Sequence, residues 1–465
     1  MTLLVAVVLW LLLLALVAHL LRRLPGLPGL VIAMGMAVLL WFLWRLPTAG
    51  EMMVMGRAIS LTRPNVFLGF NLLLDASARA PVFLLACWGG VFGLAAGWTG
   101  ADRVLFSTIP LILAALTIAL SSAPVLWAPL WLLVAAVLMA FPAQGASPRL
   151  SRPALRILLI PTLAFPFFLF AAWALAQSDL AVREHELWVA AWRGLVIGLA
   201  VLLTPVPLHS WITGLGEHAP PFAAAFLVGV WQITAYALVR RILLAYPTVA
   251  EYADPALWLP WLAVIQLLWA AVLGLGSHRL GQWWGYLLLW DYGAAFLLWS
   301  LSGEFGNEAQ VWLALARPLV LVLVAGGLQA FGRRFGANAS LSEIHGGFER
   351  LPLASIGLVA GGLFLLGWPL GALFPLRLAV IRLAEASQPG VFLWLMLSLL
   401  LMTVTAVRIL RALGRPLTDA ALLREAPHLA WLIIPLLLVG FLLSIHPSLF
   451  DPITFTLSNW LAQAP

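Results

Sequence analysis

FAAAFLVGVWQITAYALVRRILL, residues 222–244, is an apolar run interrupted by only a few polar side chains. An α-helix rises about 1.5 Å per residue, so about 20 apolar residues are enough to cross the hydrocarbon core of a bilayer. Inside lipid, the backbone N–H and C=O groups must find partners within the structure, and a helix satisfies them within one segment. The run therefore predicts a transmembrane helix.

The same pattern recurs along the whole chain. Of 465 residues, 63% are hydrophobic and 9% are charged, whereas a soluble domain carries about 25% charged residues. We predict an all-α polytopic membrane protein with about 14 transmembrane helices, since each span needs about 20 apolar residues. The candidate spans are 3–21, 28–46, 80–98, 104–121, 124–141, 156–176, 187–207, 222–244, 257–276, 283–301, 311–331, 353–377, 392–412 and 429–446.

The distribution of charge excludes some partners and predicts an orientation. The net charge is +7, but the basic residues are scattered between apolar runs and form no patch that would bind nucleic acid. All of them are arginine. More arginines fall in the inner loops when the N-terminus faces outside, so the positive-inside rule favours this arrangement. We expect a multi-pass protein of the inner (plasma) membrane with both termini on the outer side.

Prolines interrupt two of the predicted spans. Thr204-Pro205-Val206-Pro207 breaks the seventh, and the segment 367–371, which contains Pro369, breaks the twelfth. Proline lacks the backbone N–H and ends or kinks a helix. Broken helices at corresponding places in two halves are typical of transporters built from inverted repeats. The five-span spacing suits two inverted five-helix repeats, spans 4–8 and 9–13; two incidental kinks are the alternative.

These repeats would divide a single transmembrane domain, residues 1–465, into four parts. The N-terminal spans would occupy 1–98, the first repeat 104–244 and the second repeat 257–412. Residues 429–465 would form the last span and a tail.

Besides arginines assigned to loops and span edges, the predicted spans contain few charged side chains, and those expected to lie inside the membrane are Arg193, Asp291, Arg317 and Arg377. A charge in this position costs several kcal/mol and marks a functional candidate. Asp291 either takes part in ion transfer or pairs with one of the arginines and holds two helices together. Arg193 lies near the end of its span, where its side chain could extend to the interface. Gln232 is either a site residue or an ordinary interhelical hydrogen-bonding group.

Residues 206–240, VPLHSWITGLGEHAPPFAAAFLVGVWQITAYALVR, resemble the most characteristic stretch of the antiporter-like membrane subunits of respiratory complex I and Mrp-type sodium/proton antiporters. The family pattern is P-h-H-x-W-L-P-D-A-H-x-x-A-P, followed by a span that ends K-x-x-A-Y-x-L-h-R. The matching positions here are Pro207, His209, Trp211, Ala219, Pro220, Ala235, Tyr236 and Arg240. Further matches are Asp75, Tyr286, Gly293, Gly346, Gly347, Arg350, Pro352, Gly367, Pro369 and Phe374.

The resemblance implies the fold of that family but not its proton pathway. In the family, protons move through a glutamate on span 5, lysines on spans 7 and 8, and a lysine or glutamate on span 12. The corresponding positions here are Ala128, Leu202, Gln232 and Arg377, and a histidine early in span 10 is replaced by Asp291. Alanine, leucine and glutamine do not titrate, and arginine keeps its proton. The usual Glu/Lys relay is therefore missing.

Three functional hypotheses follow. The first is a divergent antiporter-like subunit of a complex I-like or Mrp-like assembly that moves protons or sodium, coupled to a partner redox or transport module. Its ion-pathway candidates are Asp291, Arg377, Gln232, His209, Arg317 and Arg193. The second is a non-pumping structural scaffold in such a complex. The third is a polytopic enzyme that acts on lipid-linked substrates, although the acidic residues of the outer loops form no tight motif.

The expected partners are other membrane subunits and the lipid bilayer, with no nucleic acid. The sequence has no flavin, nicotinamide, iron–sulfur or metal-binding motif. We therefore expect no cofactor in this chain. If the chain belongs to an NADH–quinone oxidoreductase-type enzyme, its redox centres lie in other subunits.

Overall fold

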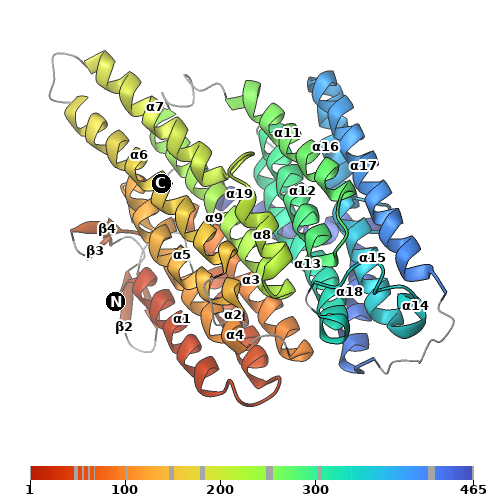
Figure 1. The fold of residues 1–465 in the computed structure, drawn as a ribbon. Helices are drawn as coiled ribbons and strands as arrows, with labels where there is room; N and C mark the ends of the chain where they lie inside the picture. Colours follow the sequence, from red (N-terminus) through yellow and green to blue (C-terminus); the bar gives the residue numbers. More distant parts are fainter. Residues whose placement is uncertain are drawn as a thin grey trace.

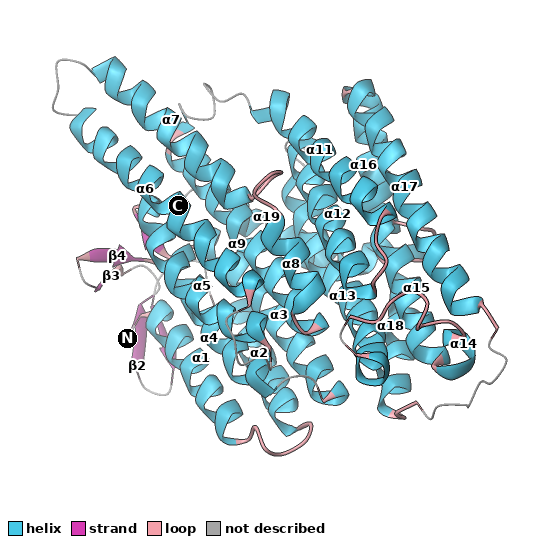
Figure 2. Cartoon of the chain, viewed as in Figure 1, coloured by secondary structure: helices cyan, strands magenta, loops and turns pink. Residues whose placement is uncertain are grey.

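The computed structural model describes residues 2–46, 51–54, 57–60, 63–67, 69–100, 103–145, 151–178, 184–247, 255–301, 306–336, 338–416 and 425–462. Helices run through nearly all of this part of the chain (Figures 1 and 2). Each of the predicted spans contains a helix or a broken pair of helices. The long helices are α1 (Leu3–Leu20), α2 (Leu27–Arg45), α3 (Ala76–Thr99), α4 (Arg103–Leu120), α5 (Ala128–Gln144), α6 (Arg152–Ser178), α7 (Glu184–Leu203), α9 (Pro221–Ala245), α11 (Pro255–Leu275), α12 (Leu280–Leu301), α13 (Gly306–Phe335), α17 (Pro389–Gly414) and α18 (His428–Ile445).

Shorter helices complete the bundle. They are α8 (Ser210–His218), α14 (Gly347–Arg350), α15 (Pro352–Leu366), α16 (Phe374–Ser387) and α19 (Asp451–Ala462), with 3₁₀ turns at Val125–Trp127 and Pro447–Phe450. Among the described residues, 12 helices are long and apolar enough to cross a membrane. The polytopic α-helical fold is thus confirmed, while the count of 14 spans, the two repeats and the four-part division stay predictions.

Both predicted helix breaks are present. Helix α7 ends at Leu203, Thr204 adopts a positive φ of 48°, and α8 begins at Ser210. Helix α15 ends at Leu366, followed by Gly367 with φ 85°, and α16 begins at Phe374. Glycine adopts this left-handed conformation without steric cost, so Gly367 suits the point where the helix stops.

The centre of the bundle consists of α9, α12 and α13. Nearly all of their residues are buried, whereas α1, α2, α17 and α18 expose many large apolar side chains. Exposed apolar residues on outer helices are expected where the surroundings are lipid. Helices α8 and α12 approach closely through two glycines: a Cβ added at Gly216 would lie 2.2 Å from the Cα of Gly285. Small residues allow such contacts between membrane helices.

Short strands, which were not expected from the sequence, lie in the connection between α2 and α3 and directly after α4. Strands β1 (Glu51–Val54) and β2 (Arg57–Ser60) form one antiparallel hairpin. Strands β3 (Asn65–Phe67) and β4 (Phe70–Leu72) form another, and β4 also pairs with β5 (Ser122–Ala123). Gly69, with φ 81°, lies in the turn between β3 and β4. Two-to-four-residue strands have too short a pattern to be recognised from sequence.

Candidate functional site

The central feature is a carboxylate held between two arginines. Asp291 lies in the middle of α12 and is fully buried. Its Oδ2 accepts a hydrogen bond from Nε of Arg317 on α13, and its Oδ1 accepts one from Nη2 of Arg377 on α16, at 2.5 Å. The sequence suggested a pair with one arginine; the structure brings both to the same carboxylate and so joins three helices.

Gln232 extends this cluster into α9. Its Oε1 accepts a hydrogen bond from Nη1 of Arg317. Its Nε2 donates to the Tyr236 hydroxyl at 2.7 Å and to the Tyr292 carbonyl at 3.0 Å. The side chain is buried and uses both ends of its amide, which is how a buried polar group avoids a large desolvation cost.

The network also satisfies carbonyl groups that the two helix breaks leave without their usual partners. In a helix, the carbonyl of residue i accepts from the N–H of residue i+4. Four residues after Leu203 is Pro207, which has no N–H, and the Leu203 carbonyl accepts instead from the Tyr292 hydroxyl at 3.1 Å. Four residues after Leu365 is Pro369, and the Leu365 carbonyl accepts from Nε of Arg377 at 3.2 Å.

The two arginines share the Asp291 carboxylate, but each lies against a different tryptophan. The guanidinium carbon of Arg377 lies 5.3 Å from the ring centre of Trp290, and that of Arg317 lies 5.8 Å from Trp88. A cation over an indole face is stabilised by about 0.5–2 kcal/mol, more when water is excluded. The cluster contains two guanidinium groups and one carboxylate, so its net formal charge is positive.

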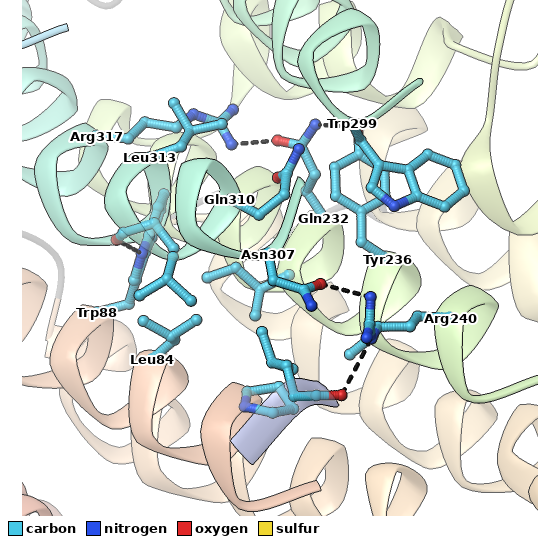
Figure 3. Close-up of a pocket in the computed structure, with 16 residues that line it drawn as sticks. Leu84, Trp88, Gln232, Tyr236, Arg240, Trp299, Asn307, Gln310, Leu313 and Arg317 are labelled. Atoms are coloured by element: carbon cyan, nitrogen blue, oxygen red, sulfur yellow. Dashed lines mark hydrogen bonds between the residues drawn. The ribbon is translucent and has the colours of Figure 1, made fainter. Parts of the chain in front are cut away.

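A cavity of about 70 Å³ begins at this cluster. Gln232 and Arg317 line its deep end, and Arg240 and Asn307 line the other end (Figure 3). Nη1 of Arg240 donates to Oδ1 of Asn307, and its Nε donates to the Leu461 carbonyl at 3.2 Å. Since one water needs about 10–15 Å³, the cavity has room for several water molecules.

The other sequence candidates lie apart from the cluster. His209 precedes α8 and is buried, with its ring 6.1 Å from that of Trp269. Among the described residues, its Nδ1 has no hydrogen-bond partner. Arg193 is exposed on α7. The structure thus brings together Asp291, Arg317, Arg377 and Gln232, and does not bring His209 or Arg193 to them.

Several residues of the network were not site candidates in the sequence analysis. Tyr236 follows Gln232 by four residues, so their shared helix face was a usable signal. Tyr292 and Trp88 gave no such signal, because their roles depend on contacts between distant helices. In the described ranges, no group of three or more His, Cys, Asp or Glu side chains could hold a metal ion.

Comparison with known sequences shows relatives among quinone oxidoreductase subunits. No protein-family profile matches the chain. It is 26% identical over 230 residues to NAD(P)H-quinone oxidoreductase subunit 2 of Synechococcus elongatus, a match that covers 45% of this chain and 42% of that protein. It is 27% identical over 215 residues to NADH-quinone oxidoreductase subunit N of Chromohalobacter salexigens, covering 45% and 44% of the two chains. The matched region thus spans less than half the length of these curated relatives.

Known structures match the fold over nearly its whole length. A chain of the membrane-bound sulfane sulfur reductase, an archaeal respiratory membrane complex, has a TM-score of 0.79 with 16% identity and covers 99% of this chain and 98% of its own. A chain of the Mrp complex from Dietzia sp. has a TM-score of 0.74 with 18% identity, covering 99% and 98%. A chain of respiratory complex I from Thermus thermophilus has a TM-score of 0.69 with 18% identity, covering 96% and 98%. The sequence similarity over less than half of the chain and the fold shared over nearly all of it both point to the antiporter-like membrane subunits of complex I and Mrp-type complexes.

Proposed function

We propose that this chain is one subunit of a multi-subunit, ion-translocating membrane assembly, with other membrane subunits as its partners. The structural neighbours are chains of multi-subunit membrane complexes, two respiratory complexes and an Mrp complex, and this chain has the same fold. A coupled redox or transport reaction would take place in partner subunits.

Within that assembly, we propose that the chain is a structural, non-pumping element whose central charges are fixed. The observation that carries this proposal is the position of Asp291, because each carboxylate oxygen bonds to a different buried arginine. Each of these charge-assisted hydrogen bonds holds one carboxylate oxygen in place and stabilises its negative charge. The cluster holds α12, α13 and α16 together and caps the break before α16 through Arg377.

Ion translocation through this chain is the second candidate, with protons or sodium as the transported ion. The cavity beside Arg317 favours it, because water in that space would join Gln232 and Arg317 to the half-buried Arg240. Chains of water can conduct protons between polar groups, but the chain supplies no lysine to titrate along the route.

Purification from the native membrane tests the assembly. Under gentle detergent extraction, an affinity tag on this chain should recover further membrane subunits in fixed ratios, identified by mass spectrometry. A tagged, unrelated membrane protein from the same cells serves as the control. Recovery of this chain alone, with a native mass equal to that of a monomer plus detergent, would contradict the proposed role as a subunit.

The proposed location is the inner membrane, with both termini on its outer side. The excess of arginines in alternate loops supports this orientation. Reporter fusions at Arg152, where α6 begins, and at Arg415, which follows α17, should both report the cytoplasmic side. An outside signal at either position would overturn the proposed topology.

A further inference from the structure

Helices α1 and α2 enclose an apolar groove at the edge of the bundle, far from the charge cluster. Helix α1 lies at this edge (Figure 1), and α2 packs more extensively on α3 than on α1. The two helices leave a space of about 330 Å³ between them. Among the described residues that line it, none is charged, and Leu13 and Val17 contribute from α1 while Met34 and Val38 contribute from α2.

The floor of the groove is closed and its outer side is open. Nε1 of Trp10 donates to the Gly35 carbonyl at 3.0 Å, so the indole spends its polar atom on α2 and presents apolar surface to the groove. Leu14 lies so close to Gly35 that a Cβ there would be 2.5 Å from Cδ1 of Leu14. On the open side, Met34 is 63% exposed and Val38 is 50% exposed. An occupant of this groove must therefore be apolar along its length.

Two arginines stand beyond one end of the groove. Arg22 and Arg23 follow α1 in the turn that leads to α2, and both are exposed. At 1.5 Å per residue, Arg22 lies about 7 Å past Val17 along the axis of α1. Neither arginine forms an ion pair with a described acidic side chain, and residues 1–46 contain no aspartate or glutamate. The groove thus leads to a compact positive charge at the place where the membrane span ends.

We propose that this groove binds one phospholipid with a net negative headgroup. An acyl chain lies in the space between Trp10 and Val17, and the phosphate lies at the membrane surface against Arg22 and Arg23. Arginine suits this role, because its planar fork of N–H donors matches phosphate oxygens. Basic residues directly beyond a transmembrane helix favour anionic lipids over zwitterionic ones. The site lies on the surface of this chain and does not depend on the proposed assembly or on Asp291.

Photo-crosslinking in the native membrane identifies what occupies the groove. The photoreactive residue p-benzoylphenylalanine replaces Met34 in the full-length chain, and the adducts formed on irradiation are identified by mass spectrometry. They should be phospholipids, enriched in anionic headgroups relative to the whole membrane. The same residue in place of Leu12, which is exposed on α1 but does not line the groove, should capture lipids without that enrichment. Capture of a protein at position 34, or the same lipid composition at both positions, would overturn the proposal.

Native mass spectrometry of the delipidated full-length chain in neutral detergent measures the headgroup preference. Dioleoyl phosphatidylglycerol should bind on the order of tenfold more tightly than dioleoyl phosphatidylcholine. Replacing both Arg22 and Arg23 with glutamine should remove this preference, whereas the same change at Arg411 and Arg415, an exposed pair at the end of α17, should keep it. Leu13→Trp, which fills the groove from an exposed position, should weaken the binding of phosphatidylglycerol. No preference in the parent, or an equal preference in both double variants, would refute the lipid site.

Discussion

Asp291→Asn is the substitution for which the structure predicts the largest loss of stability. Asparagine keeps the size of the side chain but removes the charge that compensates both Arg317 and Arg377. Breaking one buried ion pair by removing one partner costs about 3–5 kcal/mol. Here one change breaks two pairs in a fully buried site. We therefore expect a loss on the order of 4 kcal/mol or more in the free energy of unfolding.

The assay is unfolding in mixed micelles with increasing mole fraction of denaturing detergent, followed by far-UV circular dichroism. Glu308→Gln is the matched control, because Glu308 is exposed in the first turn of α13. Removing its charge should lower the free energy of unfolding by no more than about 1 kcal/mol, the usual contribution of an acidic side chain near a helix N-terminus.

A double-mutant cycle separates the ion pair from general damage. In the background of Asp291→Asn, Arg377→Gln should cost much less than it does in the parent, because it then removes an uncompensated buried charge. Contacting charged groups show coupling energies of about 0.5–3 kcal/mol in such cycles. If Asp291→Asn unfolds within about 0.5 kcal/mol of the parent, the inference that this carboxylate stabilises the bundle is refuted.

Three further substitutions test the local geometry. Gly367→Ala should lower the melting temperature, because the positive φ alone costs about 1–2 kcal/mol for alanine. The added Cβ would also lie 2.4 Å from the Cβ of Arg377. Unchanged thermal unfolding would contradict the break as described. Gly216→Ala should weaken the packing of α8 on α12, because its Cβ would lie 2.2 Å from the Cα of Gly285; equal yield and equal unfolding of variant and parent would count against that contact. Glu425→Gln should lower the free energy of unfolding in detergent by about 0.3–1 kcal/mol, because the carboxylate accepts hydrogen bonds of 3.0 Å from the first two N–H groups of α15. No measurable loss of stability would show that water replaces this cap.

The sequence was sufficient to predict the helices and both breaks. Apolar runs of about 20 residues need only local information, since each satisfies its own backbone hydrogen bonds. The breaks follow equally locally from Pro207 and Pro369, which remove N–H donors at defined positions. The resemblance of residues 206–240 to antiporter-like subunits extended the prediction from single helices to the overall architecture.

The site could be predicted only in part. Asp291 was identifiable as a buried carboxylate that needs an arginine, because few charges occur inside the spans. That Arg317 and Arg377 reach the same carboxylate depends on how α12, α13 and α16 pack, which no single segment encodes. For Arg193 the position near the end of its span had suggested a side chain that extends to the interface, and the structure shows this side chain exposed. The cavity between Arg240 and Arg317 likewise arises only from the packing of α9 against α13.

Proton flux into vesicles tests most directly whether the central charges are fixed. The full-length chain and Asp291→Asn are reconstituted separately, and flux driven by a potassium diffusion potential is followed with a pH-sensitive dye. If the central charges are fixed, both proteins give the flux of protein-free vesicles, and the variant is less stable in detergent. Robust flux through the parent that disappears in Asp291→Asn would show that this carboxylate carries protons and would contradict the fixed cluster.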